Sequence, residues 1–364
     1  MVYKEIYETL RLEIENGAYN ENGVLPSEHA LTERFDAVRE TVRRAIRMLA
    51  DEGLVVKRMG FGTVLTSHVA KAGAHIKKPQ AAAAQRKNIL FVTMDGHLSG
   101  DAAEQFHLNL SRLFERRLSE QGYNLVLKSV AAGERLKGAI DGARPAAVIF
   151  DSYVREDLYA DALFAKLPCI SVNHYTPLMT SIVSNNADGA YNAAKALMQA
   201  GHERVAYIIG KRNYQTCLKR LAGVQRLYTK NGKTLDERYI IDGDWSFGSG
   251  AKAGEYILNM PDNERPTAVF AFNDDMAYGC RSVFERNGVN VPDDVSIIGF
   301  DKSIRYDGIF APITTVDVNL DAIVECAGWY LLYRLKGDAP QMPIKIQIET
   351  KIFDSGTVKN IKEI

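Results

Sequence analysis

Short runs rich in β-branched residues alternate with helical stretches from residue 89 onward, and this alternation constrains the fold most strongly. The runs cover residues 89–92, 124–127, 147–150, 169–172, 205–209, 239–241, 268–272 and 295–298. Runs that are apolar along their whole length suit parallel strands, which are buried on both faces and joined by crossover helices. One sheet does not comfortably hold so many strands, so the sequence predicts an α/β domain with two lobes.

Residues 1–70 show a different order, with three helical stretches followed by a hairpin. Apolar residues recur every four positions in the first stretch, which is typical of an amphipathic helix: Ile6, Leu10 and Ile14. Ser27 is suited to cap a second helix, and a third helix is expected from about residue 38 to 52. Two β-like runs within 54–66 surround a glycine-containing turn and predict the hairpin.

Residues 71–88 differ in composition from both neighbours and predict a linker. They hold five basic residues, no acidic residue and a run of four alanines. A solvated tether and a positive segment that touches phosphates are both open interpretations. We therefore divide the chain into a domain at residues 1–70, a basic linker at 71–88 and a two-lobed domain at 89–364.

The formal net charge of the chain is zero, from 45 Lys+Arg and 45 Asp+Glu. This balance argues against a protein that coats nucleic acid with uniform positive charge. The zero is an average over unlike parts, because residues 1–70 hold nine basic and eleven acidic residues, while 39–58 alone hold six basic and three acidic ones. A small basic surface remains compatible with the total.

The cysteines are far apart and form no CxxC pair, so neither a disulfide framework nor a zinc ribbon is expected: Cys169, Cys217, Cys280 and Cys326. We expect no metal and no cofactor. The N-terminus lacks the apolar core of a signal peptide, and no apolar run approaches the ~20 residues that span a bilayer. These features predict a cytoplasmic protein with no membrane partner.

Arginines stand four residues apart in the third predicted helix and so share one face: Arg39, Arg43 and Arg47. Apolar residues fall on another face and can pack inside: Val42, Ile46 and Leu49. The guanidinium fork suits phosphates and guanine edges, and such a helix after a turn fits a recognition helix for DNA. A solvated charged face is the alternative interpretation of the arginines alone.

Several motifs stand in order and at spacing within residues 1–68: Tyr3-Lys4-Glu5-Ile6, Leu25-Pro26-Ser27-Glu28, Arg39-Glu40-Thr41-Val42-Arg43-Arg44-Ala45, Glu52-Gly53-Leu54 and Gly60-Phe61-Gly62-Thr63. This pattern resembles the winged helix-turn-helix domain of the gluconate-repressor (GntR) family. The resemblance implies that the third helix enters the major groove and that the wing tip reaches the minor groove. It places ten residues at the DNA: Tyr3, Ser27, Glu28, Arg39, Glu40, Thr41, Arg43, Arg44, Gly60 and Gly62.

Two positions at the start of the third helix keep alternatives open. The Glu40 carboxylate can accept a hydrogen bond from a cytosine amine, or it can serve the helix dipole. The family usually has a serine where Val38 stands, and valine can neither cap a helix nor bond a phosphate. We expect Asp36 to cap the helix instead.

Polar residues follow the ends of several predicted strands, where ligands bind in α/β folds. Three segments carry them: Lys219-Arg220-Leu221-Ala222-Gly223, Phe272-Asn273-Asp274-Asp275-Met276, and Ile298-Gly299-Phe300-Asp301. Over about residues 88–353 the chain resembles the effector domain of the lactose-repressor (LacI) family, which is related to periplasmic sugar-binding proteins. The resemblance implies that Arg220, Asn273 and Asp301 bind hydroxyl groups. It also implies that three side chains line the cleft: Phe106, Asn173 and Trp245.

Structural roles are the alternatives for three of these residues. Trp245 and Phe106 suit core packing as well as a cleft, and Asp301 suits a helix N-cap. The first loop of the domain adds Asp95 and His97 as candidate contacts. The family often has Gln-Pro where this chain has Val318-Asn319, so a side-chain bond across the cleft is expected to be lost.

A GntR-type head joined to a LacI-type effector domain is similar to the arabinose-repressor group. The resemblance implies a homodimeric repressor of sugar-utilisation genes that binds double-stranded operator DNA. A small sugar, a pentose such as arabinose or a related monosaccharide, is expected between the lobes. No P-loop, G-x-S-x-G, HExxH or GxGxxG motif points to an enzyme. A sugar-binding protein or sugar-processing enzyme without a regulatory DNA role is the alternative.

Overall fold

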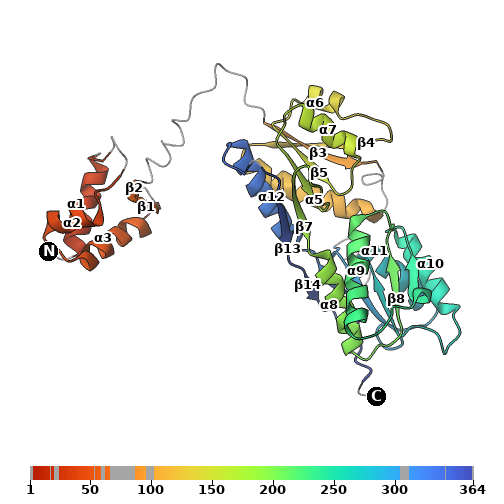
Figure 1. Ribbon diagram of the computed structural model, residues 1–364. Helices are drawn as coiled ribbons and strands as arrows, with labels where there is room; N and C mark the ends of the chain where they lie inside the picture. Colours follow the sequence, from red (N-terminus) through yellow and green to blue (C-terminus); the bar gives the residue numbers. More distant parts are fainter. Residues whose placement is uncertain are drawn as a thin grey trace. The chain divides into compact units, whose positions relative to one another are not determined.

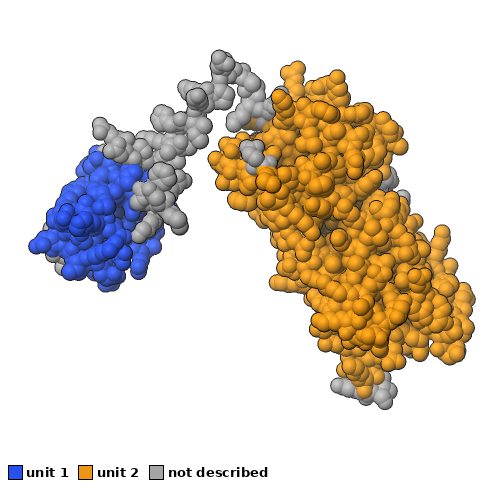
Figure 2. Space-filling model, in the orientation of Figure 1, with its two compact units in different colours: residues 1–83 blue, residues 84–364 orange. Residues whose placement is uncertain are grey.

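The computed structural model describes residues 3–16, 18–19, 24–52, 54–58, 62–65, 87–95, 102–303, 311–340 and 342–362. The chain forms two units, Met1–Ala83 and Ala84–Ile364, which are described separately below (Figure 2). Three features expected from the sequence lie outside the described residues: Gly60 of the wing, His97, and residues 71–86 of the linker.

Three helices and a two-stranded ribbon make up the first unit: α1 (Tyr3–Glu15), α2 (Glu28–Phe35), α3 (Arg39–Asp51), β1 (Val55–Arg58) and β2 (Gly62–Leu65) (Figure 1). The two strands pair antiparallel, as the hairpin signal predicts. The apolar faces of the helices enclose a core that includes Ile6, Leu10, Leu31, Val42 and Leu49. Burial of each such side chain contributes about 1.5–3 kcal/mol, which holds the outer face of α3 at a fixed orientation within this unit.

The turn between α2 and α3 differs from the expectation for Asp36. This residue has a φ of 46° and ends α2, with its backbone N–H bonded to the carbonyl oxygen of Glu33 at 3.4 Å. The extended backbone of Val38 precedes α3, and no side chain caps that helix. The expectation that Asp36 caps α3 is therefore wrong, because its left-handed backbone closes the preceding helix instead. Ser27 does cap α2, since its Oγ accepts a bond from the Ala30 N–H at 3.2 Å.

Two six-stranded sheets form the lobes of the second unit. Lobe 1 has the order β13-β7-β6-β5-β3-β4, and lobe 2 has the order β14-β12-β11-β10-β8-β9. All neighbouring strands are parallel except β12 and β14. The strands are β3 (Asn88–Met94), β4 (Asn124–Val130), β5 (Ala147–Asp151), β6 (Cys169–Val172), β7 (Thr180–Ser184), β8 (Val205–Ile209), β9 (Ile240–Asp242), β10 (Ala268–Ala271), β11 (Ser296–Phe300), β12 (Thr314–Asp317), β13 (Lys345–Ile348) and β14 (Lys351–Phe353).

Helices cover these sheets and complete two separate apolar cores. They are α5 (Ala102–Ser119), α6 (Lys137–Ala143), α7 (Glu156–Phe164), α8 (Asn186–Gln199), α9 (Gln215–Lys230), α10 (Phe247–Leu258), α11 (Asp274–Arg286) and α12 (Leu320–Leu335), with a short 3-10 turn η1 (Glu237–Tyr239). Helices α5 and α12 pack together on lobe 1, while α8 and α9 pack together on lobe 2 (Figure 1). The two-lobed α/β architecture predicted from the strand runs is confirmed. No helix in the described part of the chain is long and apolar enough to cross a membrane.

The chain passes between the lobes three times, and hydrogen bonds tie the three passages together. Ser184, the last residue of β7, donates its Oγ–H to the carbonyl oxygen of Val318, before α12, at 3.1 Å. The Asn185 N–H donates to the Ile348 carbonyl oxygen at 2.8 Å, and Asn185 Nδ2 lies 3.2 Å from the Glu349 carboxylate. We refer to these three passages as the hinge, because relative motion of the lobes must pass through them.

Candidate functional site

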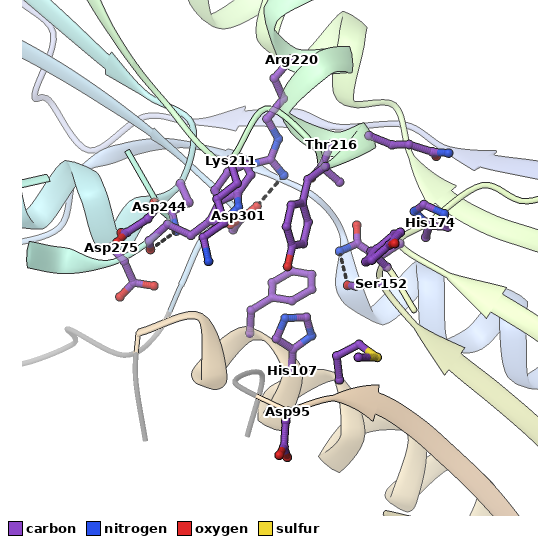
Figure 3. A pocket seen from close by; sticks show the side chains of 18 residues that line it. Asp95, His107, Ser152, His174, Lys211, Thr216, Arg220, Asp244, Asp275 and Asp301 are labelled. Atoms are coloured by element: carbon purple, nitrogen blue, oxygen red, sulfur yellow. Dashed lines mark hydrogen bonds and ion pairs between the residues drawn. The ribbon is translucent and has the colours of Figure 1, made fainter. Parts of the chain in front are cut away.

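A cavity of about 320 Å³ lies between the two lobes, and we call it the ligand cavity. Its size falls within the range of small-molecule sites. The six residues predicted to bind or line a ligand all border it: Phe106, Asn173, Arg220, Trp245, Asn273 and Asp301. Figure 3 shows Arg220 and Asp301 on one side of the cavity and His107 and Ser152 on another. The structure thus brings together residues that lie up to 195 positions apart in the chain (Phe106 to Asp301).

Arg220 is the centre of the lobe 2 wall. It is buried, and its guanidinium donates to Asn186 Oδ1 at 2.8 Å, to Asp301 Oδ1 at 2.9 Å and to the Phe272 carbonyl oxygen. The guanidinium carbon also lies 3.6 Å from the ring centroid of Phe300. Because charged hydrogen bonds and the aromatic face hold the fork in place, Arg220 presents a fixed orientation to anything that enters the cavity.

Burial shifts the pKa of both carboxyls near Arg220. It raises the pKa of Asp301, and the neighbouring Arg220 guanidinium opposes that rise. Burial likewise raises the pKa of Asp274 well above its usual value, and the nearby Asp301 charge adds to the effect. Asp274 accepts bonds from Thr315 Oγ1 and from the Ser303 N–H, both at 2.6 Å. Asp301 therefore pairs with Arg220 at the cavity, whereas Asp274 supports the loop behind it.

The raised pKa of Asp274 predicts a pH-dependent effect of Asp274→Asn. Since its pKa is higher in the folded than in the unfolded state, its stabilising contribution is full below the unfolded pKa and is lost as pH rises through the folded pKa. Asparagine carries no such proton, so the free energy of unfolding of the variant, relative to the parent, should increase from pH 4 to pH 8. Urea unfolding at several pH values measures this difference, with the exposed Asp293→Asn as control. A difference that stays constant with pH would contradict the prediction.

Asn273 and Trp245 are joined in the same wall. Asn273 caps α11, since its Oδ1 accepts from the Met276 N–H at 3.0 Å, and its Nδ2 donates to the Trp245 carbonyl oxygen at 2.8 Å. Trp245 has a φ of 78° and packs against the lobe 2 core while bordering the cavity. Its Nε1 is buried and has no hydrogen-bond partner among the described residues. Trp245 therefore combines the core and cleft roles that the sequence left as alternatives.

Gly210 makes room for the indole of Trp245, and Gly210→Ala should displace it. A Cβ at residue 210 would lie 2.1 Å from Trp245 Cζ2, far inside van der Waals contact. We expect a loss of about 1–3 kcal/mol in stability from the overpacking and a shift in the emission of Trp245. Measuring both in a Trp329→Phe background isolates this indole, since the chain has two tryptophans. In the control Gly248→Ala the new Cβ meets nothing closer than 3.8 Å; equal effects in both variants would refute the proposed contact.

The lobe 1 wall is a chain of hydrogen bonds that ends at an imidazole. Asn173 Nδ2 donates to Ser152 Oγ at 3.0 Å, and Ser152 Oγ donates to Asp151 Oδ1 at 3.0 Å. The other oxygen of the fully buried Asp151 lies 2.6 Å from His107 Nδ1. Phe106 packs against the apolar clusters of both lobes. The wall thus offers an oriented imidazole beside an aromatic ring.

Several residues of the ligand cavity hold their side chains on unusual backbone. Positive φ values occur at Ser152 (56°), Asn173 (57°), Trp245 (78°) and Asp301 (103°). Such conformations cost of order 1–3 kcal/mol each for a residue with a side chain, and they persist where the surroundings fix them. Four strained residues around one cavity are typical of a pre-organised binding site.

Besides Phe106, two pairs of residues among the described ones make contact between the lobes beside the cavity. The Gln215 carboxamide pairs with the backbone of Tyr175: its Oε1 accepts from the Tyr175 N–H at 3.1 Å, and its Nε2 donates to the Tyr175 carbonyl oxygen at 3.0 Å. The rings of Tyr153 and Tyr214 also approach to a centroid distance of 6.0 Å. The first pair forms a two-bond clasp between lobe 1 and lobe 2.

Sequence reasoning missed several residues that line the ligand cavity: His107, Ser152, His174, Lys211, Asp244 and Asp275. Ser152 and Lys211 stand one or two positions beyond β5 and β8, so the strand-end rule that selected Asp301 applies to them too. His107 lies inside helix α5 and carries no such signal. Asp95, which the sequence offered as a candidate, does border the cavity.

In the first unit, the residues predicted to touch DNA lie on α1, at the start of α2, on α3 and in the two-stranded ribbon. Glu28 Oε2 lies 3.2 Å from Arg39 Nε and 2.9 Å from Arg43 Nε, so one carboxylate orients both arginines. The Arg44 guanidinium lies 4.1 Å from the ring centroid of Tyr3. The remaining described members lie at the start of α2, in the first turn of α3 and at the start of β2: Ser27, Glu40, Thr41 and Gly62.

Comparison with known proteins agrees with both units. Residues 2–65 match the family described as "Bacterial regulatory proteins, gntR family", and residues 194–354 match the "Periplasmic binding protein-like domain". A transcriptional repressor PurR of Aliivibrio fischeri is 35% identical over 186 residues, which is 51% of this chain and 55% of the relative. The PurR of Photobacterium profundum is 38% identical over 141 residues, 39% of this chain and 42% of the relative. The chain thus spans about half the length of the curated relatives it matches.

Solved structures share the fold. The complex of the transcriptional regulator CelR with cellobiose aligns over 95% of this chain and 94% of its own, with a TM-score of 0.66 and 23% identity. A LacI family regulator from Enterococcus faecium with bound ribose aligns over 76% of this chain and 100% of its own, with a TM-score of 0.66 and 17% identity. The chain therefore carries a GntR-type helix-turn-helix domain, followed by a periplasmic-binding-protein-like domain whose fold is that of the solved LacI family regulators.

Proposed function

We propose that this protein is a sequence-specific transcriptional repressor of sugar-utilisation genes, acting in the cytoplasm as a homodimer. The first unit binds double-stranded operator DNA through α3, and the second binds a small sugar between its lobes. The sugar is a pentose such as arabinose or a related monosaccharide. The observation that carries the proposal is the presence, in one chain, of an oriented arginine pair on a helix-turn-helix and a pre-organised polar cavity between two hinged lobes.

The cavity chemistry supports a polyhydroxylated ligand. Arg220 and Asp301 supply fixed donors and acceptors, and the rings of Phe106 and Trp245 can cover the apolar face of a sugar. When the lobes close around a ligand, the surfaces that each lobe presents to a second copy of the chain move. This movement changes the spacing of the two DNA-binding units in the dimer. A ligand shifts this equilibrium only by the difference in its affinity for the two states.

The proposal is tested with DNA selected by the full-length protein from a random library. Fluorescence anisotropy measures its affinity with and without each sugar of a panel of pentoses, hexoses and deoxysugars, and a thermal-shift screen finds the sugars that bind. We expect at least one sugar to raise the melting temperature and to change operator affinity. A sugar that binds without any effect on operator affinity would favour a sugar-binding protein with no regulatory DNA role.

A further inference from the structure

A second cavity, of about 280 Å³, adjoins the ligand cavity in the same unit. Four residues line both cavities: Asn173, His174, Gln215 and Thr216. The second cavity receives residues from β13 of lobe 1 and from α9 of lobe 2, and it lies against the start of α8 at the hinge. It is therefore a lateral extension of the ligand cavity that also touches both lobes.

The two cavities differ in charge. The ligand cavity is lined by four carboxylates and two cations: Asp95, Asp244, Asp275, Asp301, Lys211 and Arg220. The second cavity is lined by three cations and one carboxylate: Lys219, Arg226, Lys345 and Asp188. Since the ligand cavity repels anions and the second one attracts them, we call the second the basic cavity.

Two cations of the basic cavity are available to a ligand. Asp188 is paired with Arg226, so that carboxylate is already engaged. No carboxylate of the described residues lies within ion-pair distance of Lys219 or Lys345. The ammonium of Lys345 lies 5.6 Å from the ring centroid of Tyr175, which keeps it beside the cavity. One available cation thus comes from each lobe.

Backbone groups near the two lysines reinforce this polarity. Helix α9 begins at Gln215, and no side chain caps its first turn, so backbone N–H groups at this helix start lack a side-chain acceptor. The Gln215 carboxamide itself is engaged in the clasp to Tyr175 and offers little to a ligand. The ammonium groups of Lys219 and Lys345 are therefore the main groups that would hold an anion here, and the backbone at the start of α9 adds to their attraction.

We propose that the basic cavity is the subsite for an anionic group, a carboxylate or a phosphate, carried by the sugar whose hydroxyls bind in the ligand cavity. This rests on the proposed function of the second unit as a sugar-binding domain. An anion between Lys219 and Lys345 draws lobe 2 toward lobe 1 beside the hinge, so it also favours the closed state. Among the monosaccharides of the proposed function, the inference thus selects those that carry a carboxylate or a phosphate.

Calorimetric titration of the full-length protein with matched sugars tests the proposal. The pairs are galactose with galacturonate, which tests a carboxylate, and ribose with ribose 5-phosphate, which tests a phosphate. We expect the anionic member of at least one pair to bind roughly tenfold more tightly than its neutral partner, as two exposed charge contacts allow. Neutral members that bind as tightly as, or more tightly than, their anionic partners in both pairs would overturn the subsite.

Variants locate the effect. Lys219→Gln with Lys345→Gln should remove the advantage of the anionic sugar, whereas Lys233→Gln with Lys252→Gln, two exposed lysines outside both cavities, should retain it. An advantage that survives in the first double variant would overturn the assignment. A neutral sugar that binds tightly and changes operator affinity, with no anionic preference, refutes the subsite alone. If none of the four sugars binds, the subsite fails together with this choice of ligand class.

Discussion

Asp301→Asn is expected to shift the response to sugar to much higher sugar concentrations while leaving operator binding intact. The variant keeps the shape of the side chain but removes the charge that pairs with Arg220 at 2.9 Å inside the ligand cavity. A hydrogen bond to a charged group contributes about 1.5–3 kcal/mol, so ligand affinity should fall roughly 10-fold to 150-fold. The substitution also leaves the buried Arg220 guanidinium without its partner, which lowers the stability of the folded state by about 3–5 kcal/mol. Operator binding should stay intact because α3 lies in the other unit.

Ligand titration and operator anisotropy on the same preparation measure the two effects of Asp301→Asn. The matched control is Asp242→Asn, which breaks an exposed ion pair to Arg212 at 2.7 Å on the same lobe but outside the ligand cavity. That control should respond to sugar normally, because exposed pairs contribute little. A normal sugar response in Asp301→Asn would show that Arg220 and Asp301 serve the fold of lobe 2 and not the ligand.

The fold of the second unit was largely predictable because its central strands are apolar on both faces. All eight apolar runs became strands, and each of β5, β6, β8, β10 and β11 is fully buried. Four strands were not predicted: β7, β12, β13 and β14. The last two are short and mostly exposed at sheet edges, where polar residues alternate with apolar ones and the continuous apolar signal is absent.

The ligand cavity was predictable where a polar residue directly follows a buried strand. Asp301 follows β11 in this way, and Asn273 stands two positions after the end of β10. His107 could not be predicted from the sequence, because it lies inside helix α5. Only the fold brings its Nδ1 within 2.6 Å of Asp151, which is 44 residues away in the chain. The expectation that Asp36 caps α3 was wrong for a local reason. The sequence shows that Asp36 is able to cap a helix, but the backbone conformation of the turn decides whether it ends α2 or begins α3.

Arg43→Ala is expected to remove specific operator binding while leaving non-specific DNA binding largely unchanged. Glu28 Oε2 lies 2.9 Å from Arg43 Nε and 3.2 Å from Arg39 Nε. The two guanidinium groups therefore extend from α3 in a similar, restrained orientation. A bidentate contact to a base contributes about 1–3 kcal/mol of discrimination. Two units on a palindromic site double this to about 2–6 kcal/mol, a loss in affinity of roughly 30-fold to 20,000-fold.

The comparison that isolates this role of Arg43 uses the same charge change elsewhere. Arg212→Ala removes an exposed arginine from the second unit and should leave both specific and non-specific binding unchanged. Competition anisotropy with the selected operator and with random-sequence DNA at one salt concentration separates base contacts from phosphate contacts, since only the latter are shared by every sequence. If Arg43→Ala weakens both DNAs equally, the arginine contacts phosphate. If it weakens neither, α3 is not the recognition helix, and the orientation that Glu28 imposes on its arginines serves the unbound protein alone.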